Sequence, residues 1–120
     1  MARPIIDPET WASLESLEAS GAPGFLRELV KEFLTQAPQR LERLREAASS
    51  GDAKALEREA HGFKGSCGSV GAFAMAESCD QLESIGREGS CNGHGEALSS
   101  LERHWLGVRA ALEGELARLA

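Results

Sequence analysis

Hydrophobic residues recur along the chain at the three- and four-residue steps that are typical of amphipathic helices. These stripes predict five helices, at about 8–18, 25–49, 53–70, 72–87 and 96–119. The most regular stripe lies in the last segment and consists of Leu98, Leu101, Trp105, Val108, Leu112, Leu116 and Leu119. No segment shows the convincing two-residue alternation of a strand.

Residues with capping and turn preferences separate the stripes. Asp7 suits an N-cap, and Pro8 suits the first helical position. Gly51 can end one helix in the left-handed conformation while Asp52 caps the next, and so short a connection makes the two helices antiparallel. Pro38 lies inside a stripe that resumes in phase, so we expect a kink there and not a helix end.

The predicted fold is therefore all-α, an up-and-down antiparallel four-helix bundle with an additional short N-terminal helix. A length of 120 residues suits one domain, here 1–120. Leu14 and Leu17 are predicted to face the core from the first helix. The larger aromatic side chains are also expected in the core, and they are Trp11, Phe25, Phe33, Phe73 and Trp105.

Charge and cysteine content exclude several classes of function. The net charge is −6 and the 13 Lys and Arg residues form no basic stripe, which argues against nucleic acid or an anionic membrane as partner. No long apolar run suggests a signal peptide or a membrane span. Cys67, Cys79 and Cys91 lack the spacing of a disulfide framework or zinc site. We expect a cytoplasmic, free-standing monomer without a bound cofactor or metal.

The segment around His61 contains unusual residues for a helix. The apolar stripe through Ala60 and Phe63 turns His61 away from the core. Gly62, Gly65 and Gly68 each cost about 1 kcal/mol relative to alanine inside a helix. A smooth surface that lets another protein approach the imidazole would explain all three glycines.

The residues near His61 suit phosphoryl transfer. A neutral imidazole has one ring nitrogen available as a nucleophile or ligand. Lys64, one turn further on, can place an ammonium beside a phosphoryl group. Ser66 and Ser69 offer hydroxyls at less direct angles.

The sequence His61-Gly-Phe-Lys64-Gly65-Ser66, followed by Gly71-Ala72 and by Cys79-Asp-Gln-Leu-Glu83-Ser-Ile-Gly86-Arg87, resembles the signature of histidine-phosphotransfer (HPt) domains. The similarity extends over about 7–116. It implies that His61 is phosphorylated, that Lys64 is its electrostatic partner, and that Gly65 admits the other protein. It also implies that Glu83 hydrogen-bonds the imidazole, although a glutamate at this position could simply be solvated.

The resemblance implies a phosphocarrier without kinase activity. His61 would accept a phosphoryl group from the aspartate of one response-regulator receiver domain and pass it to another, within a phosphorelay that includes a hybrid sensor histidine kinase. Magnesium is expected on the receiver and not on this chain. Phe25, Leu26 and Leu29 are candidates for the surface on which a receiver docks.

Three alternatives remain open at this point. The chain could be the phospho-accepting domain of a chemotaxis-type or hybrid histidine kinase. It could be a helical interaction module that works without phosphorylation. It could also be a metal or haem bundle, which needs inward-facing ligands on several helices. His94 and His104 have no ligand partner at metal spacing, and we expect both to be solvated.

Overall fold

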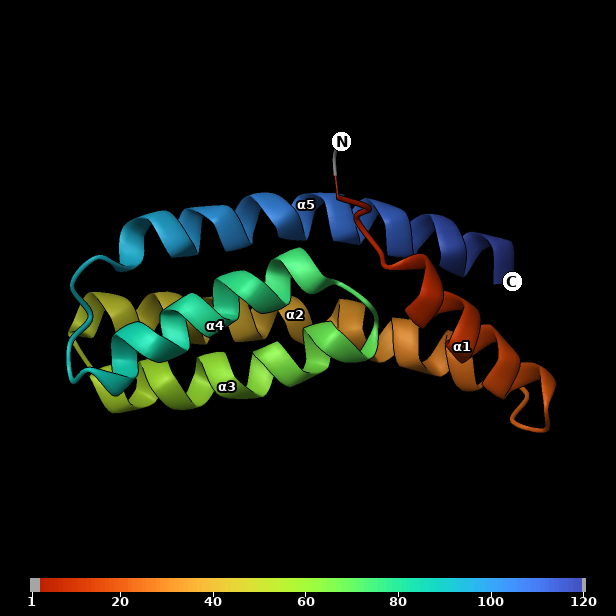
Figure 1. The fold of residues 1–120 in the computed structure, drawn as a ribbon, viewed down its shortest axis with the longest axis horizontal. Coiled ribbons are helices and arrows are strands. Elements are labelled where there is room, and N and C mark those ends of the chain that lie inside the picture. Colours follow the sequence, from red (N-terminus) through yellow and green to blue (C-terminus); the bar gives the residue numbers. More distant parts are fainter. Residues whose placement is uncertain (1–2, 120) are drawn as a thin grey trace.

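The computed structural model describes residues 3–119, which form five helices and no strand (Figure 1). The helix bounds are Pro8–Ala19 (α1), Phe25–Ser50 (α2), Ala53–Ser69 (α3), Phe73–Arg87 (α4) and His94–Leu119 (α5). Each bound lies within two residues of its predicted value, and α2 continues through Pro38. In the described part of the chain, no helix is both long and apolar enough to cross a membrane.

Helices α2 to α5 form the predicted antiparallel four-helix bundle. Helices α2 and α4 each pack against both α3 and α5, which closes the bundle. Helix α1 packs chiefly against α2 and lies at one end (Figure 1). The fold class predicted from the hydrophobic pattern is thus confirmed.

The turns follow from local side-chain and backbone chemistry. The Asp7 carboxylate accepts a hydrogen bond from the backbone N–H of Thr10 at 2.9 Å, and the Asp52 carboxylate accepts one from the N–H of Ala55 at 3.1 Å. Gly51 has a φ of 73°, in the left-handed region that favours glycine. These caps begin α1 and α3 where the sequence predicted.

Three apolar helix faces meet around Phe33 of α2. The centroid of its ring lies 6.1 Å from that of Phe63 on α3 and 6.1 Å from that of Trp105 on α5. All three rings are buried, and contacts of this kind stabilise a core beyond the area they bury.

Some predictions about the core were wrong. Leu17, Phe25 and Phe73 are exposed, because helical spacing identifies the apolar face of a helix but not how far its neighbours extend. Leu17 lies near the end of α1, while Phe25 and Phe73 begin α2 and α4. Leu26 is 1% exposed, so it cannot form a docking surface. Leu29 is half-buried.

Helices α3 and α4 approach each other closely at Gly86. A Cβ atom at this position would lie 2.6 Å from both the carbonyl oxygen of Ala53 and the backbone nitrogen of Glu57. The site therefore admits only glycine without a backbone shift. Gly86 lies about one turn after Glu83, so this contact holds the adjacent part of α4 against α3.

Candidate functional site

His61 lies on the outer face of α3. Its side chain is 71% exposed, whereas the neighbouring Ala60 and Phe63 are fully buried. The hydrophobic pattern predicted this orientation. The other two histidines differ: His104 is exposed, but His94 is half-buried and its Nδ1 lies 2.8 Å from the carbonyl oxygen of Cys91, so the expectation that His94 is solvated was wrong.

Glu83 of α4 contacts the imidazole of His61. Glu83 is 5% exposed, which rules out the simple solvated role, and its Oε2 lies 3.0 Å from Nδ1 of His61. An ionised carboxylate can only accept a hydrogen bond, so Nδ1 carries the proton. The lone pair then lies on Nε2, the ring nitrogen that is not bound to Glu83.

Two cations also contact the Glu83 carboxylate. Nζ of Lys64 lies 2.5 Å from Oε1 as an ion pair, and Nη2 of Arg87 donates a hydrogen bond to Oε2 at 2.8 Å. Lys64 lowers the pKa of Glu83 most, burial opposes this, and the hydrogen bond with His61 lowers it further. Glu83 is therefore ionised at neutral pH.

Lys64 is held between two carboxylates of α4. In addition to Glu83, Asp80 accepts a hydrogen bond from its Nζ at 3.1 Å. These contacts with Glu83 and Asp80 raise the pKa of Lys64. Lys64 therefore lies one turn from His61, as predicted, but its charge is already compensated. Sequence reasoning missed Asp80.

Arg87 was also missed as a member of this cluster, although the sequence contained a signal for it. Glu83 and Arg87 are four residues apart on one helix, the spacing at which an acid and a base form an ion pair. Arg87 also reaches Glu57 of α3, with 3.5 Å between Nε and Oε2. The pair thereby links the two helices beside His61.

The three glycines near His61 do not share one role. A Cβ atom at Gly65 or Gly68 would meet nothing within 4 Å, which fits the prediction of a smooth open surface. At Gly62, however, a Cβ would lie 3.0 Å from Nη1 of Arg40, a residue of α2. Gly62 is exposed, so it belongs to that open surface, but unlike the other two it also leaves room for the Arg40 side chain.

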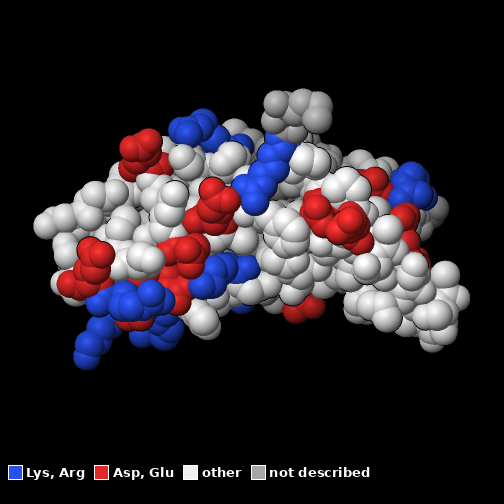
Figure 2. Space-filling model, in the orientation of Figure 1, with Lys and Arg blue, Asp and Glu red and all other residues white. Residues whose placement is uncertain are grey.

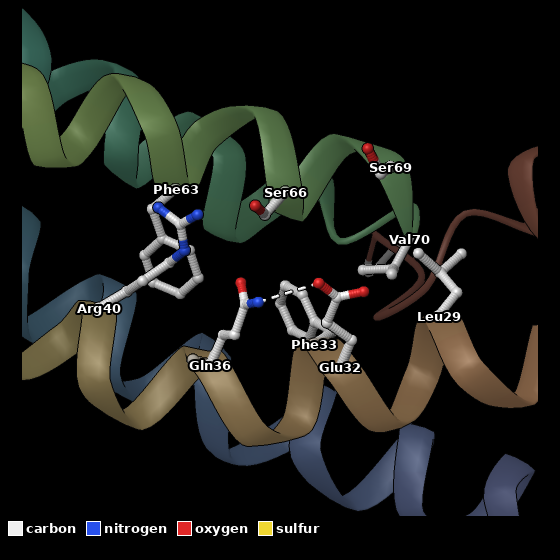
Figure 3. A pocket seen from close by; sticks show the side chains of 10 residues that line it. Leu29, Glu32, Phe33, Gln36, Arg40, Phe63, Ser66, Ser69 and Val70 are labelled. Carbon is white, nitrogen blue, oxygen red and sulfur yellow. Dashed lines mark hydrogen bonds between the residues drawn. The ribbon is translucent and has the colours of Figure 1, made fainter.

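A groove of about 170 Å³ lies between α2 and α3 (Figure 3). The residues that line it are Leu29, Glu32, Phe33, Gln36, Ala37, Arg40, Phe63, Ser66, Ser69 and Val70. The Ser69 hydroxyl donates to the carbonyl oxygen of Gly65 at 3.0 Å. Ser66 and Ser69 line this groove from α3.

A family model and a solved structure place this chain in the same family. A family model described as the Hpt domain matches residues 28–120. The structure of histidine-containing phosphotransfer protein B (HptB) from Pseudomonas aeruginosa PAO1 is 30% identical with a TM-score of 0.86, and the match covers 98% of each chain. No curated protein sequence matches significantly.

Two plant structures share the fold. A putative histidine-containing phosphotransfer protein from rice is 24% identical with a TM-score of 0.82, over 96% of this chain and 81% of that one. The protein ZmHP2 from maize is 24% identical with a TM-score of 0.83, over 96% of this chain and 84% of that one.

The fold and the comparisons define a histidine phosphotransfer protein, a class of phosphocarriers in phosphorelay signalling. The chain belongs to the Hpt domain family.

Proposed function

We propose that Nε2 of His61 is the atom that carries the phosphoryl group. The observation that supports this most directly is the 3.0 Å contact between Nδ1 of the exposed His61 and the buried carboxylate of Glu83. That contact fixes the ring and its tautomer, and it leaves the Nε2 lone pair for attack. Lys64 helps to keep Glu83 ionised, and Arg87 holds the carboxylate in place by a hydrogen bond.

The proposed transfer begins with a receiver domain that carries an aspartyl phosphate. The Nε2 lone pair attacks phosphorus, the Nε2–P bond forms, and the bond between phosphorus and the aspartate oxygen breaks with its electron pair left on the carboxylate. The ring becomes positively charged while Nδ1 keeps its proton, and the Glu83 carboxylate stabilises that charge. Transfer to a second receiver reverses these steps.

The remaining parts of the reaction are assigned to the partner. We propose that the receiver supplies magnesium and most of the stabilisation of the transferring group. The open surface at Gly65 would admit its active site. We also propose that this chain has no kinase activity of its own, acts as a cytoplasmic monomer, and works with response-regulator receivers and a hybrid sensor histidine kinase.

A phosphotransfer assay tests the proposal. The protein is incubated with a panel of phosphorylated receivers, together with the variants His61→Gln and His104→Gln. We expect acid-labile, alkali-stable label on the wild type and on His104→Gln, whose substitution is on the exposed face of α5. Label on His61→Gln, or no label on the wild type from any receiver, would contradict the proposal.

A further inference from the structure

The side chain of Arg40, a residue of α2, reaches α3 close to His61. Its Nη1 lies 3.0 Å from the position of a Cβ at Gly62, the residue that follows His61. Standard bond lengths then place Nη1 within about 8 Å of the Cα atom of His61. Figure 3 shows the Arg40 side chain rising from α2 with its guanidinium beside the Phe63 ring, whose centroid is 5.9 Å from Cζ.

The Arg40 guanidinium has no acceptor within residues 3–119. No carboxylate of this part of the chain lies within 4.0 Å of it, and it donates no hydrogen bond there. The Phe63 ring holds it by a cation–π contact, which leaves the N–H donors at its edge available. Arg40 is half-buried, and the contact with Phe63 places its guanidinium before any ligand arrives.

The cations on the other side of His61 are already paired. Lys64 and Arg87 face three carboxylates, those of Glu83, Asp80 and Glu57. This side therefore has more negative than positive charge, and acidic and basic side chains lie together over α3 and α4 (Figure 2). A phosphoryl group adds close to two negative charges at neutral pH, and Lys64 and Arg87 can neutralise it only by giving up existing partners.

Arg58, about one turn before His61 on α3, is a weaker candidate. Its side chain is 70% exposed, and its Nε lies 3.8 Å from Glu59. Within residues 3–119, no aromatic ring contacts its guanidinium in the way that Phe63 contacts that of Arg40.

We propose that Arg40 contacts the phosphoryl group on Nε2 of His61, and that residue 62 is glycine because a side chain there would displace the guanidinium. This inference rests on the proposed function of His61. The guanidinium donates hydrogen bonds to phosphoryl oxygens and exchanges no proton, so the bonds that form and break are those of the transfer described above. Arg40 stabilises the added negative charge during both loading and unloading.

Phosphorylation by phosphoramidate tests this contact without any receiver. The small donor transfers its phosphoryl group to the imidazole and releases ammonia, so a slower reaction cannot come from impaired docking. We expect labelling of Arg40→Gln to be about fivefold slower than that of the wild type, the effect of one unit charge at about 4 Å in water. Arg40→Lys should recover part of the rate, and Arg109→Gln, on the exposed face of α5, should match the wild type.

The outcomes separate this inference from the proposed function. Label on the wild type at His61, with Arg40→Gln labelled equally fast, overturns the role of Arg40 and leaves His61 as the carrier. A normal phosphoramidate rate combined with a raised KM for a phosphorylated receiver assigns Arg40 to receiver docking, and this also overturns the inference. Failure of wild-type labelling at His61 by both kinds of donor contradicts the proposed function itself.

Two further measurements exclude a merely structural role. The Nε–H nitrogen resonance of Arg40 should shift when the wild type is phosphorylated, whereas that of Arg109 should not. Gly62→Ala should slow phosphoramidate labelling as Arg40→Gln does, without loss of thermal stability, because the added methyl meets only the end of the Arg40 side chain. An unmoved Arg40 resonance, or normal labelling of Gly62→Ala, would contradict the proposed contact.

Discussion

The two sides of His61 are built in opposite ways. On the α4 side, the helices touch through Gly86, the Glu83 carboxylate is buried, and its charge is matched by Lys64 and Arg87. On the α2 side there is a groove, and the Arg40 guanidinium has no acceptor in the described part of the chain.

This difference separates two requirements of a phosphocarrier. The imidazole must be held in one orientation and tautomer, which calls for buried, fully paired groups. The phosphoryl group must arrive and leave, which calls for open surface and unpaired donors. Substitutions on the α4 side should therefore disturb the ring and the fold, whereas those on the open surface should affect mainly the exchange of the phosphoryl group.

The largest effect is expected for Gly86→Ala. The added methyl would meet backbone atoms of Ala53 and Glu57 at 2.6 Å, and we expect unfolding in urea to show a loss of about 3 kcal/mol. Gly114→Ala is the matched control, because a Cβ there meets nothing within 4 Å and should increase stability by about 0.5–1 kcal/mol. Equal stability of the Gly86→Ala variant and the wild type would show that α3 and α4 do not approach as closely as described.

Glu83→Gln should have the next largest effect. The amide oxygen can still accept the Nδ1 hydrogen bond of His61, but the negative charge that stabilises the imidazolium is lost. A charge-assisted hydrogen bond contributes about 1.5–3 kcal/mol against about 1 kcal/mol for a neutral one, so we expect phosphotransfer to slow by about tenfold. Glu77→Gln, on the same helix, is the control, since Glu77 is exposed and pairs with Arg3. Equal rates for Glu83→Gln and the wild type would show that the charge of Glu83 does not contribute to phosphotransfer.

Gly65→Ala should have opposite effects on the stability of the protein and on the rate of phosphotransfer from a receiver. A Cβ there meets nothing, so the free protein should gain about 0.5–1 kcal/mol of unfolding free energy. Transfer from a phosphorylated receiver should nevertheless slow, whereas labelling by phosphoramidate should match the wild type. If both donors react at the wild-type rate, Gly65 is not needed to admit the receiver.

The smallest effect concerns pH. Because Lys64 and His61 lower the pKa of Glu83 in the folded protein, Glu83 contributes stability above the unfolded carboxyl pKa of about 4.3, and this contribution is lost as the pH falls through the lower folded value. The difference in unfolding free energy between the wild type and Glu83→Gln should therefore fall as the pH is lowered below about 4.5. A difference that does not fall in this range would contradict the lowered pKa of Glu83.

Much of this arrangement could be predicted from local sequence. Helical spacing predicted the five helices and the outward orientation of His61, and capping preferences correctly predicted the helix ends at Asp7 and Gly51. The family resemblance supplied the pairing of Glu83 with the imidazole, which the structure shows as a 3.0 Å contact. These features depend on one helix or on a pattern that the family shares.

Features that depend on how two helices cross could not be predicted. To predict that Arg40 lies beside Gly62, one must know where α2 crosses α3. To predict that position 86 admits only glycine, one must know where α4 meets α3. The exposure of Phe25 and Phe73 has the same origin, because periodicity does not show where a neighbouring helix ends.

The aromatic contact at the centre of the bundle has a spectroscopic consequence. Trp105 of α5 is buried beside Phe33 of α2. The other tryptophan, Trp11 of α1, is half-buried. Each tryptophan can be replaced by phenylalanine in turn, which leaves a single indole as the fluorescent reporter. Helix α1 packs chiefly against α2, so we expect it to detach before the bundle unfolds. Trp11 emission should therefore change at a lower denaturant concentration than Trp105 emission, which reports unfolding of the bundle.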